Sequence, residues 1–211
     1  MTEWIDISVN LCSPMPCWPG SAKFQVDRVS DMNKGALANA SILVMGSHAG
    51  THVDSPLHFV KDGRSIDTIP LDATNGRARL FEFRGVKSIT PEMLEPHKIR
   101  RGERVLFKTD NSFRVWKLCD FVEDYVYISS KAAKYLVSRG VKSVGIDYLS
   151  IGEFGMDGVA AHQAFLNHGV WLIEGLDLSA VSPGTYELIC LPLKLIGCEA
   201  SPARAMVKPV L

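Results

Sequence analysis

The stretch SKAAKYLVSRGVKSVGID, residues 130–147, decides the class of fold, because it is typical of a helix followed by a strand. A helix is expected over 130–139, and it ends before Gly140, since glycine suits the left-handed conformation found after a helix end. The next run, 141–146, is apolar and has the length of a buried strand that ends in Asp147.

The same order of elements returns once, with a helix over 158–168 that ends at Gly169 and a strand over 170–173. The rest of the chain favours strands, which are expected over 4–9, 40–46, 80–83, 104–108 and 187–191, with a short helix at 91–94 and a C-terminal tail. The strand over 40–46 is expected to be buried, because its centre is an apolar run. Strands first and helix–strand alternation later predict a mixed α/β fold.

Composition narrows the class of protein before any site is considered. A hydrophobic fraction of 46% with 22% charged residues indicates a folded chain, and no linker of Gly, Ser or Pro divides residues 1–211, which predicts a single domain. Lys and Arg balance Asp and Glu at 23 each, which argues against a nucleic-acid partner. No apolar run approaches the roughly 18 residues of a membrane span. Five cysteines without a Cys-x-x-Cys pair favour reduced thiols and a cytoplasmic location.

The densest polar cluster lies in residues 46–59, which hold half of the six histidines of the chain. Gly50 and Pro56 oppose a helix here, so the stretch is expected to continue the preceding strand as extended chain. Alternate residues of an extended chain share a face, and Gly50 leaves room beside that face for an ion or a substrate. Four polar residues have even numbers and are expected on this face: His48, His52, Asp54 and His58.

These residue types indicate a metal site. Two imidazoles and a carboxylate supply three of the four ligands that zinc prefers and leave one position for water. Manganese and iron accept the same nitrogen and oxygen ligands. A polar loop with incidental histidines is the alternative, but four convergent groups favour the metal. His58 is either a further ligand or a general base, and the proline between it and Asp54 favours the base.

Partners for this cluster are expected at the ends of other elements. Glu174 directly follows the apolar run 170–173, and a carboxylate at the end of a buried strand is costly unless it is paired or bound to metal. His162 lies near the start of the helix that leads to this strand and is either a partner of Glu174 or an ordinary surface residue.

Three other residues remain ambiguous or structural. Asp147 ends a strand, where sites of α/β proteins often lie, but a turn-forming role is an equal alternative. Trp18 is held between Cys17 and Pro19 and either lines a pocket or plugs a loop. His168 falls in the last helical turn before a glycine, where a cation complements the helix dipole, and is interpreted as structural.

The string HAGTHVDSPLHF, residues 48–59, resembles the signature His-x-Gly-Thr-His-x-Asp-x-Pro-x-His-Phe of the metal-dependent cyclase family, which includes bacterial kynurenine formamidases and isatin hydrolases. The signature is specific because it fixes eight of twelve positions. The resemblance covers most of the chain, since Trp18-Pro19-Gly20, residues 162–175 and residues 201–205 also look like features of this family.

The resemblance implies a site with two divalent ions, zinc first and manganese as the alternative. In that site one ion is held by His48 and His52, the other by His162, and both are bridged by Asp54 and Glu174. His58 is then the general acid/base, and Trp18 becomes a wall for an aromatic substrate. The resemblance further implies a single domain of the swivelling β/β/α type and a homodimer.

The activity that the resemblance implies is hydrolysis of a carbon–nitrogen amide bond, by hydroxide formed from metal-bound water and with His58 relaying a proton. An aryl formamide such as N-formylkynurenine is the first substrate class, and a cyclic amide of the isatin type is the second. Bacterial kynurenine formamidases typically carry Asp-Thr-Pro-Ser where this chain has residues 147–150, DYLS, which indicates a different pocket shape. A non-catalytic metal-binding protein and an iron oxygenase are the rival classes.

Overall fold

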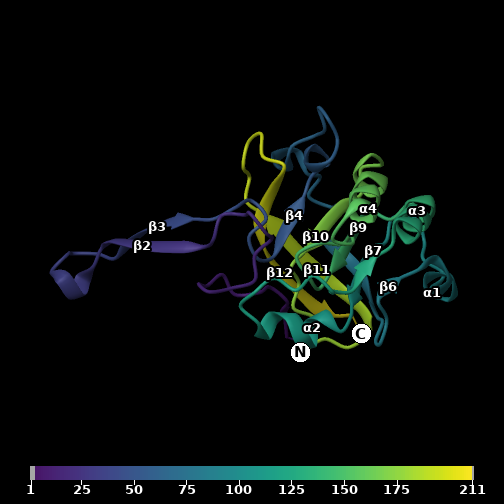
Figure 1. The fold of residues 1–211 in the computed structure, drawn as a ribbon, viewed down its shortest axis with the longest axis horizontal. Helices are drawn as coiled ribbons and strands as arrows, with labels where there is room; N and C mark the ends of the chain where they lie inside the picture. Colours follow the sequence, from purple (N-terminus) through teal and green to yellow (C-terminus); the bar gives the residue numbers. More distant parts are fainter. Residues whose placement is uncertain (1–2, 211) are drawn as a thin grey trace.

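The computed structural model describes residues 3–210 and shows one large sheet that closes on itself and a narrow ribbon that projects from it (Figure 1). In order across the large sheet the strands are β1 (Ile5–Asp6), β12 (Ala200–Pro209), β11 (Gly184–Pro192), β5 (Gly76–Glu82), β7 (Arg104–Lys108), β9 (Ser143–Ile146), β10 (Trp171–Glu174) and β4 (His52–Asp54). The first residues of β12 also pair with β4, so the sheet forms a barrel-like ring. Closure leaves β4 with a neighbour on each side.

The four strands β5, β7, β9 and β10 run parallel, and both of their faces are covered. Outside the ring they pack against α1 (Pro91–Leu94), α3 (Ser130–Arg139) and α4 (Met156–Leu166). Inside the ring, side chains such as Leu106, Ile173 and Leu188 form a second core. A parallel sheet needs both faces covered, which explains why these strands are continuous apolar runs.

The remaining elements are short or lie outside the ring. They are β2 (Gln25–Ser30), β3 (Ala40–Val44), β6 (Ser88–Ile89), β8 (Tyr127–Ile128), α2 (Asn111–Arg114) and 3-10 turns that include Pro56–His58. β2 and β3 pair only with each other, and so do β6 and β8. Among the described residues, every helix is too short or too polar to cross a lipid bilayer.

The predicted mixed α/β fold is confirmed, and several elements lie where the sequence places them. α3 occupies residues 130–139 and ends at Gly140, whose φ of 71° is the left-handed conformation expected there. Two expectations about the ends of the chain are wrong. The strand expected over 4–9 is limited to Ile5–Asp6, and the expected C-terminal tail is β12, a strand of 10 residues that closes the ring.

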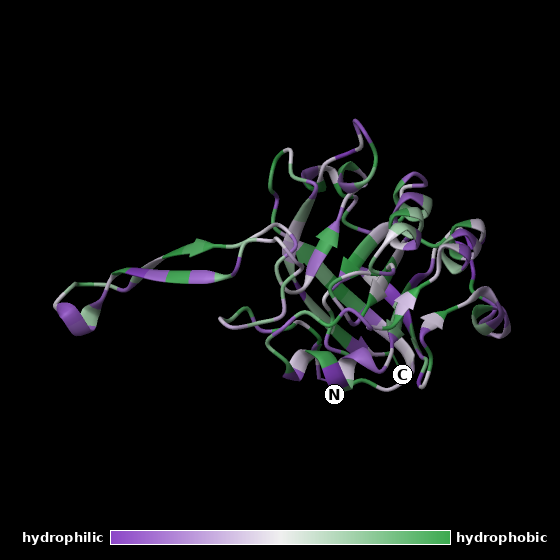
Figure 2. Cartoon of the chain, viewed as in Figure 1, coloured by the Kyte–Doolittle hydropathy of each residue, from purple (hydrophilic) through white to green (hydrophobic). Residues whose placement is uncertain are grey.

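The expectation that 40–46 is a buried strand is wrong in its burial. β3 forms over Ala40–Val44, but every one of its residues is exposed, with Ile42 at 54% and Leu43 at 55%. Among the described strands it pairs with β2 alone, and the two strands form an arm, residues 25–44, that reaches away from the ring and includes apolar segments (Figure 2). An apolar run predicts burial only where a second layer exists to cover it.

The path of residues 46–58 also differs from the expected extended continuation. The chain turns between Val44 and His52 and enters a different sheet, where β4 is only three residues long. His58 then lies in the 3-10 turn Pro56–His58. Alternation therefore places only His52 and Asp54 on a common strand face, and turns bring His48 and His58 to the same place.

Candidate metal centre

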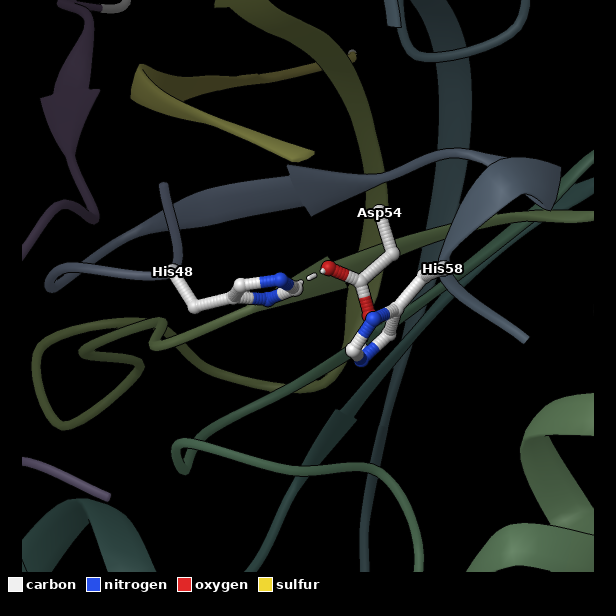
Figure 3. A group of neighbouring side chains, drawn as sticks. All are labelled: His48, Asp54 and His58. Atoms are coloured by element: carbon white, nitrogen blue, oxygen red, sulfur yellow. Dashed lines mark ion pairs between the residues drawn. The ribbon is translucent and has the colours of Figure 1, made fainter. Parts of the chain in front are cut away.

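All six residues expected to form the metal cluster and its acid/base meet at one end of the ring. β4 lies antiparallel to β10, and the register places Glu174 opposite His52. The helix α4, which leads into β10, contributes His162. His48 and His58 each approach a different oxygen of Asp54, and their rings lie 4.3 Å apart (Figure 3). The alternative in which His162 is a surface residue is wrong, because its side chain is 5% exposed.

Glu174 faces two histidines of the cluster, and Asp54 faces three. The Oε2 atom of Glu174 lies 3.2 Å from Nε2 of His52, and Oε1 lies 3.2 Å from Nε2 of His162. Asp54 places Oδ1 3.0 Å from Nδ1 of His48 and 3.5 Å from Nε2 of His52. Its other oxygen, Oδ2, lies 4.0 Å from Nε2 of His58. Both carboxylates therefore have the arrangement of a bridge between two positions.

Backbone carbonyls fix the tautomers of the two buried histidines. Nδ1 of His52 lies 2.9 Å from the carbonyl oxygen of Gly50, and Nδ1 of His162 lies 2.7 Å from that of Gly158. A carbonyl oxygen only accepts, so each Nδ1 carries the hydrogen and donates it. In the neutral ring, Nε2 is then left with a lone pair that faces the carboxylates, which is the arrangement of a metal-binding histidine with its supporting carbonyl.

The cluster passes a direct test for a cation. His52 and Asp54 are both 0% exposed, yet Nε2 of His52 and both carboxylate oxygens of Asp54 have no hydrogen-bond partner within residues 3–210. Burying a carboxylate without donors is strongly unfavourable. Nitrogen and oxygen atoms that converge at 3–4 Å without hydrogen-bond geometry are satisfied by an ion between them, and imidazole with carboxylate is a donor set that divalent transition metals accept. The residues therefore fit a divalent metal.

Charge coupling in the cluster shifts the pKa values in opposite directions. Burial opposes a charge on the His48 ring, but the Asp54 carboxylate outweighs it and raises the pKa of His48 to about 9. Burial likewise opposes charge on Asp54, and the imidazoles around it, His48 first, still hold the pKa of its carboxyl below the ordinary value. At His58 burial dominates over the attraction of Asp54, and the pKa is lowered. His58 is therefore the neutral, more exposed member of the set.

Two glycines let the strands that carry the ligands approach each other. Gly175 has a φ of 70°, and a Cβ built on it would lie 2.1 Å from the carbonyl oxygen of Gly50. The hydroxyl of Thr51 donates to the Gly175 carbonyl oxygen at 2.5 Å. The room expected beside Gly50 for an ion is absent, because a Cβ there would lie 2.7 Å from the Leu11 side chain. Gly50 serves a close approach of backbones.

The structure adds one acidic residue that the sequence analysis missed. Oε1 of Glu199 accepts a hydrogen bond from the Ser47 hydroxyl at 2.5 Å and lies 3.5 Å from Nε2 of His48. The Glu199 carbonyl oxygen also accepts from both the backbone N–H and the hydroxyl of Ser55. Glu199 thus ties the segments before and after β4 to the start of β12. No feature of the sequence predicts that Glu199 joins the cluster, because it lies about 150 residues from Ser47 and the motif.

The cluster opens into a cavity of about 240 Å³. His58, His162 and Glu174 form part of its wall, and Trp18 lies in the wall as expected of a substrate contact. The Trp18 ring lies 5.1 Å from that of Phe121 and 5.2 Å from that of Phe154, so it belongs to an aromatic group at the cavity. Trp18 is half-buried and lines the cavity, which favours the pocket wall over a buried loop plug.

The two remaining candidates lie away from the cluster. Asp147 is fully buried and accepts hydrogen bonds from the backbone N–H and hydroxyl groups of Thr109 and Ser112, so it anchors the start of α2. Asp147 therefore has the structural, turn-forming role that was the alternative to a role in a site. His168 is exposed at the end of α4, with Nδ1 2.8 Å from the Ala164 carbonyl oxygen. Leu149 and Ser150, in the segment that departs from the formamidase pattern, both line the cavity.

A closed mixed sheet with a buried histidine–carboxylate cluster at one end defines a class of metal-binding α/β proteins. The model of the Cyclase family matches residues 5–153. The kynurenine formamidase of Bacillus cereus is 32% identical over 209 residues, which are 99% of each chain. This chain belongs to the Cyclase family, as the resemblance of residues 48–59 predicts.

Solved structures agree with this assignment. One is described as a potential metal-dependent hydrolase with cyclase activity; it is 33% identical, and the match covers 100% of both chains with a TM-score of 0.87. Isatin hydrolase A from Ralstonia solanacearum shares the fold, with 20% identity and a TM-score of 0.83 over 99% of this chain and 92% of that one.

Proposed function

We propose that this protein is a metal-dependent amidohydrolase that cleaves the carbon–nitrogen bond of an aryl formamide, with residues 1–211 acting as one domain. The observation that carries the proposal is the pair of carboxylates, Asp54 and Glu174, buried among four histidines, with both oxygens of Asp54 lacking a hydrogen-bond donor among the described residues. The open cavity beside them supports an enzyme over a structural metal clip, since structural sites close their coordination sphere with protein ligands.

The proposed centre holds two divalent ions, zinc first and manganese as the alternative. His48 and His52 would hold the first ion and His162 the second, and Asp54 and Glu174 would bridge them. The distances support this division, because the two oxygens of Glu174 face His52 and His162 separately. All four histidines are used in this scheme, whereas an iron oxygenase would need only two of them with one carboxylate.

The bound ions would lower the pKa of water from 15.7 toward roughly 7 and polarise the amide carbonyl. His58 would hold and deliver the proton that the departing aniline needs. Its position supports this role: the ring lines the cavity, its Nε2 atom stays 4.0 Å from Asp54, and its pKa is lowered, so that it accepts a proton at neutral pH. Trp18 would stack on the aromatic ring of the substrate and orient it.

N-formylkynurenine is the first candidate substrate, because the Bacillus cereus relative is a kynurenine formamidase. Cyclic amides of the isatin type are the second candidate, and the shared fold of isatin hydrolase A supports them. Tyr148 and Leu149 stand where the formamidase pattern has Thr and Pro, and Leu149 lines the cavity, which favours testing both classes.

The test is formate release from N-formylkynurenine by the purified protein, with zinc or manganese added and after chelation. We expect metal-dependent release at more than about 1 per second, an ordinary enzymatic rate. Ring opening of isatin, followed by absorbance, is the parallel assay. A protein that retains two equivalents of metal and hydrolyses neither substrate would contradict the proposal.

We also propose a homodimer in the cytoplasm. The arm supports the dimer, because an isolated two-stranded ribbon is marginally stable in water and this one exposes Val29 at 60% and Met32 at 58%. A second copy of the chain would cover those side chains. The five cysteines, all free, support a reducing compartment.

A further inference from the structure

The lining of the cavity includes acidic residues but no strongly basic ones. None of the residues that line it is a lysine or an arginine, and the acidic ones are Glu153 and Glu174. Glu174 is 2% exposed and faces His52 and His162, so it belongs to the cluster. Glu153 is therefore the one carboxylate of the lining that the proposed chemistry does not use.

The backbone and the side chain of Glu153 are both held in place. A Cβ built on Gly158 would lie 2.0 Å from the Glu153 carbonyl oxygen, so the loop is pressed against the start of α4. The Tyr127 hydroxyl donates to Oε1 of Glu153 at 2.9 Å. Burial and this hydrogen bond raise the pKa of Tyr127 to about 12, so the phenol remains a donor at neutral pH.

Glu153 has no positive partner in the part of the chain that the structure describes. Within residues 3–210, no lysine, arginine or histidine forms an ion pair with it, and no protein group donates to Oε2. It is half-buried at the cavity, so one oxygen is fixed by Tyr127 and the other remains available. A carboxylate held in this way forms a charge-assisted hydrogen bond with an incoming ammonium group.

We propose, on the basis of the function proposed above, that Glu153 makes this cavity select aryl amides whose neighbouring side chain carries a protonated amine. A divalent pair would exceed the two negative charges of Asp54 and Glu174 by about two, so the loaded cluster attracts no ammonium group, and Glu153 is the negative side chain of the lining that remains available for one. A substrate that fills the cavity contacts the cluster with its amide and reaches Glu153 with its side chain. A substrate carboxylate finds no lysine or arginine in the lining.

The test uses three formanilides that differ only in the ortho substituent. The 3-aminopropanoyl compound is a cation at pH 7, the butanoyl compound is its neutral isostere, and the 3-carboxypropanoyl compound is an anion. We expect kcat/KM to be about tenfold higher for the cation than for the neutral isostere, as for a charge-assisted hydrogen bond, and lower again for the anion. Raising the salt concentration reduces the ratio, because part of the site is exposed.

The variant Glu153→Gln keeps an acceptor for Tyr127 and removes only the charge. We expect the ratio of cation to neutral isostere to fall to about one, while metal content and kcat/KM for the neutral compound change by less than about twofold. The matched control is Glu123→Gln, which removes an exposed acidic residue outside the cavity lining and leaves the ratio unchanged.

Binding of the three corresponding anilines, measured by titration calorimetry, separates this inference from the proposed function. If the metal-loaded protein hydrolyses no formanilide but binds the cationic aniline about tenfold more tightly than the neutral one, and Glu153→Gln abolishes that preference, the charge selection stands and the reaction is wrong. Equal affinities for the cationic and neutral anilines in the wild type, or an unchanged preference in Glu153→Gln, overturn the inference.

Discussion

Two strands that adjoin in sequence, β3 and β4, have opposite environments. β3 carries Ile42, Leu43 and Val44, and all three side chains are exposed. β4 carries His52 and Asp54, which are 0% exposed. The difference follows from their neighbours: β4 lies between β10 and β12 inside the closed ring, whereas β3 has only β2 beside it. Position in the sheet, and not hydropathy, sets their burial.

In the metal-free monomer, both strands therefore contribute unfavourable free energy, but for different physical reasons. The polar groups of β4 lose water and find no hydrogen-bond donors, and a cation relieves that cost. The apolar groups of β3 remain in water, and a second protein surface relieves that cost. Local rules of sequence pattern fail most often at functional positions, and here each failure indicates the kind of partner that is missing.

The largest expected effect is the loss of a ligand from β4. His52→Ala removes a nitrogen ligand and leaves Asp54 buried without compensation, so we expect the metal to be lost. Turnover should fall on the order of 10³-fold or more, since free water has a pKa of 15.7 instead of about 7. Elemental analysis by mass spectrometry together with the formamidase assay measures both. Ile42→Ala in β3 is the matched control and should retain metal and activity.

A smaller effect is expected at His58, which lies at the edge of the cluster. His58→Ala should retain both ions and lose about 10²–10⁴ in kcat, the usual contribution of a positioned proton relay. The same metal analysis and assay apply. A variant that is inactive and has also lost its metal would make His58 a ligand and would contradict its role as acid/base.

Glu199 lies outside β4 but contacts His48, so it tests whether support from a neighbouring segment matters for metal binding. Glu199→Gln weakens the support of the His48 ring, and we expect metal affinity to fall about 10–100-fold, as for other residues that orient a ligand. Competition with a chelator of known affinity measures the change. Glu187→Gln, an exposed acidic residue of β11, is the control. An unchanged metal affinity would show that the contact between Ser47 and Glu199 only stabilises the loop and does not orient the His48 ring.

Protons compete with metal for His48. In the metal-free protein the pKa of His48 is raised from 6.5 to about 9, so binding a metal displaces a proton below that pH. We expect affinity to rise about tenfold per pH unit between 6.5 and 9, measured by chelator competition. A raised pKa also means that this ion pair stabilises the metal-free fold fully below pH 6.5 and ceases to do so as the pH rises through about 9. Thermal unfolding of the chelated protein checks that sign.

The smallest effect on the site is expected from the arm. Ile42→Asp places a charge in the proposed dimer contact, so sedimentation should change from dimer to monomer while metal content stays constant. A wild-type protein that is monomeric at micromolar concentration would show that the arm is not a dimer contact. Loss of metal on dissociation would show instead that the two regions are coupled.

Sequence pattern predicts the elements that form local contacts better than those that depend on distant ones. α3 is predicted to the residue because its cap at Ser129 and its end at Gly140 are local. β12 is missed because two of the strands that it pairs with, β1 and β4, are distant in the sequence, so no local feature of residues 200–209 indicates their neighbours.

The same division holds for the candidate site. The spacing of His48, His52 and Asp54 predicts their convergence, although the chain turns where extended backbone is expected. Glu174 is predicted because a carboxylate after an apolar strand needs a partner. Glu153 and Glu199 are not predicted, since the first depends on which wall of a cavity it forms and the second on how β12 closes the ring.

The contact between Gly175 and Gly50 has a consequence for recognising inactive relatives. A single methyl group at position 175 would overlap the Gly50 carbonyl oxygen and force β10 away from β4, separating Glu174 from His52. Such a protein would keep every residue of the 48–59 motif and every ligand, and a motif search would still count it among the enzymes. Surveys of this family for proteins that have lost catalysis can therefore use a residue that never touches metal or substrate.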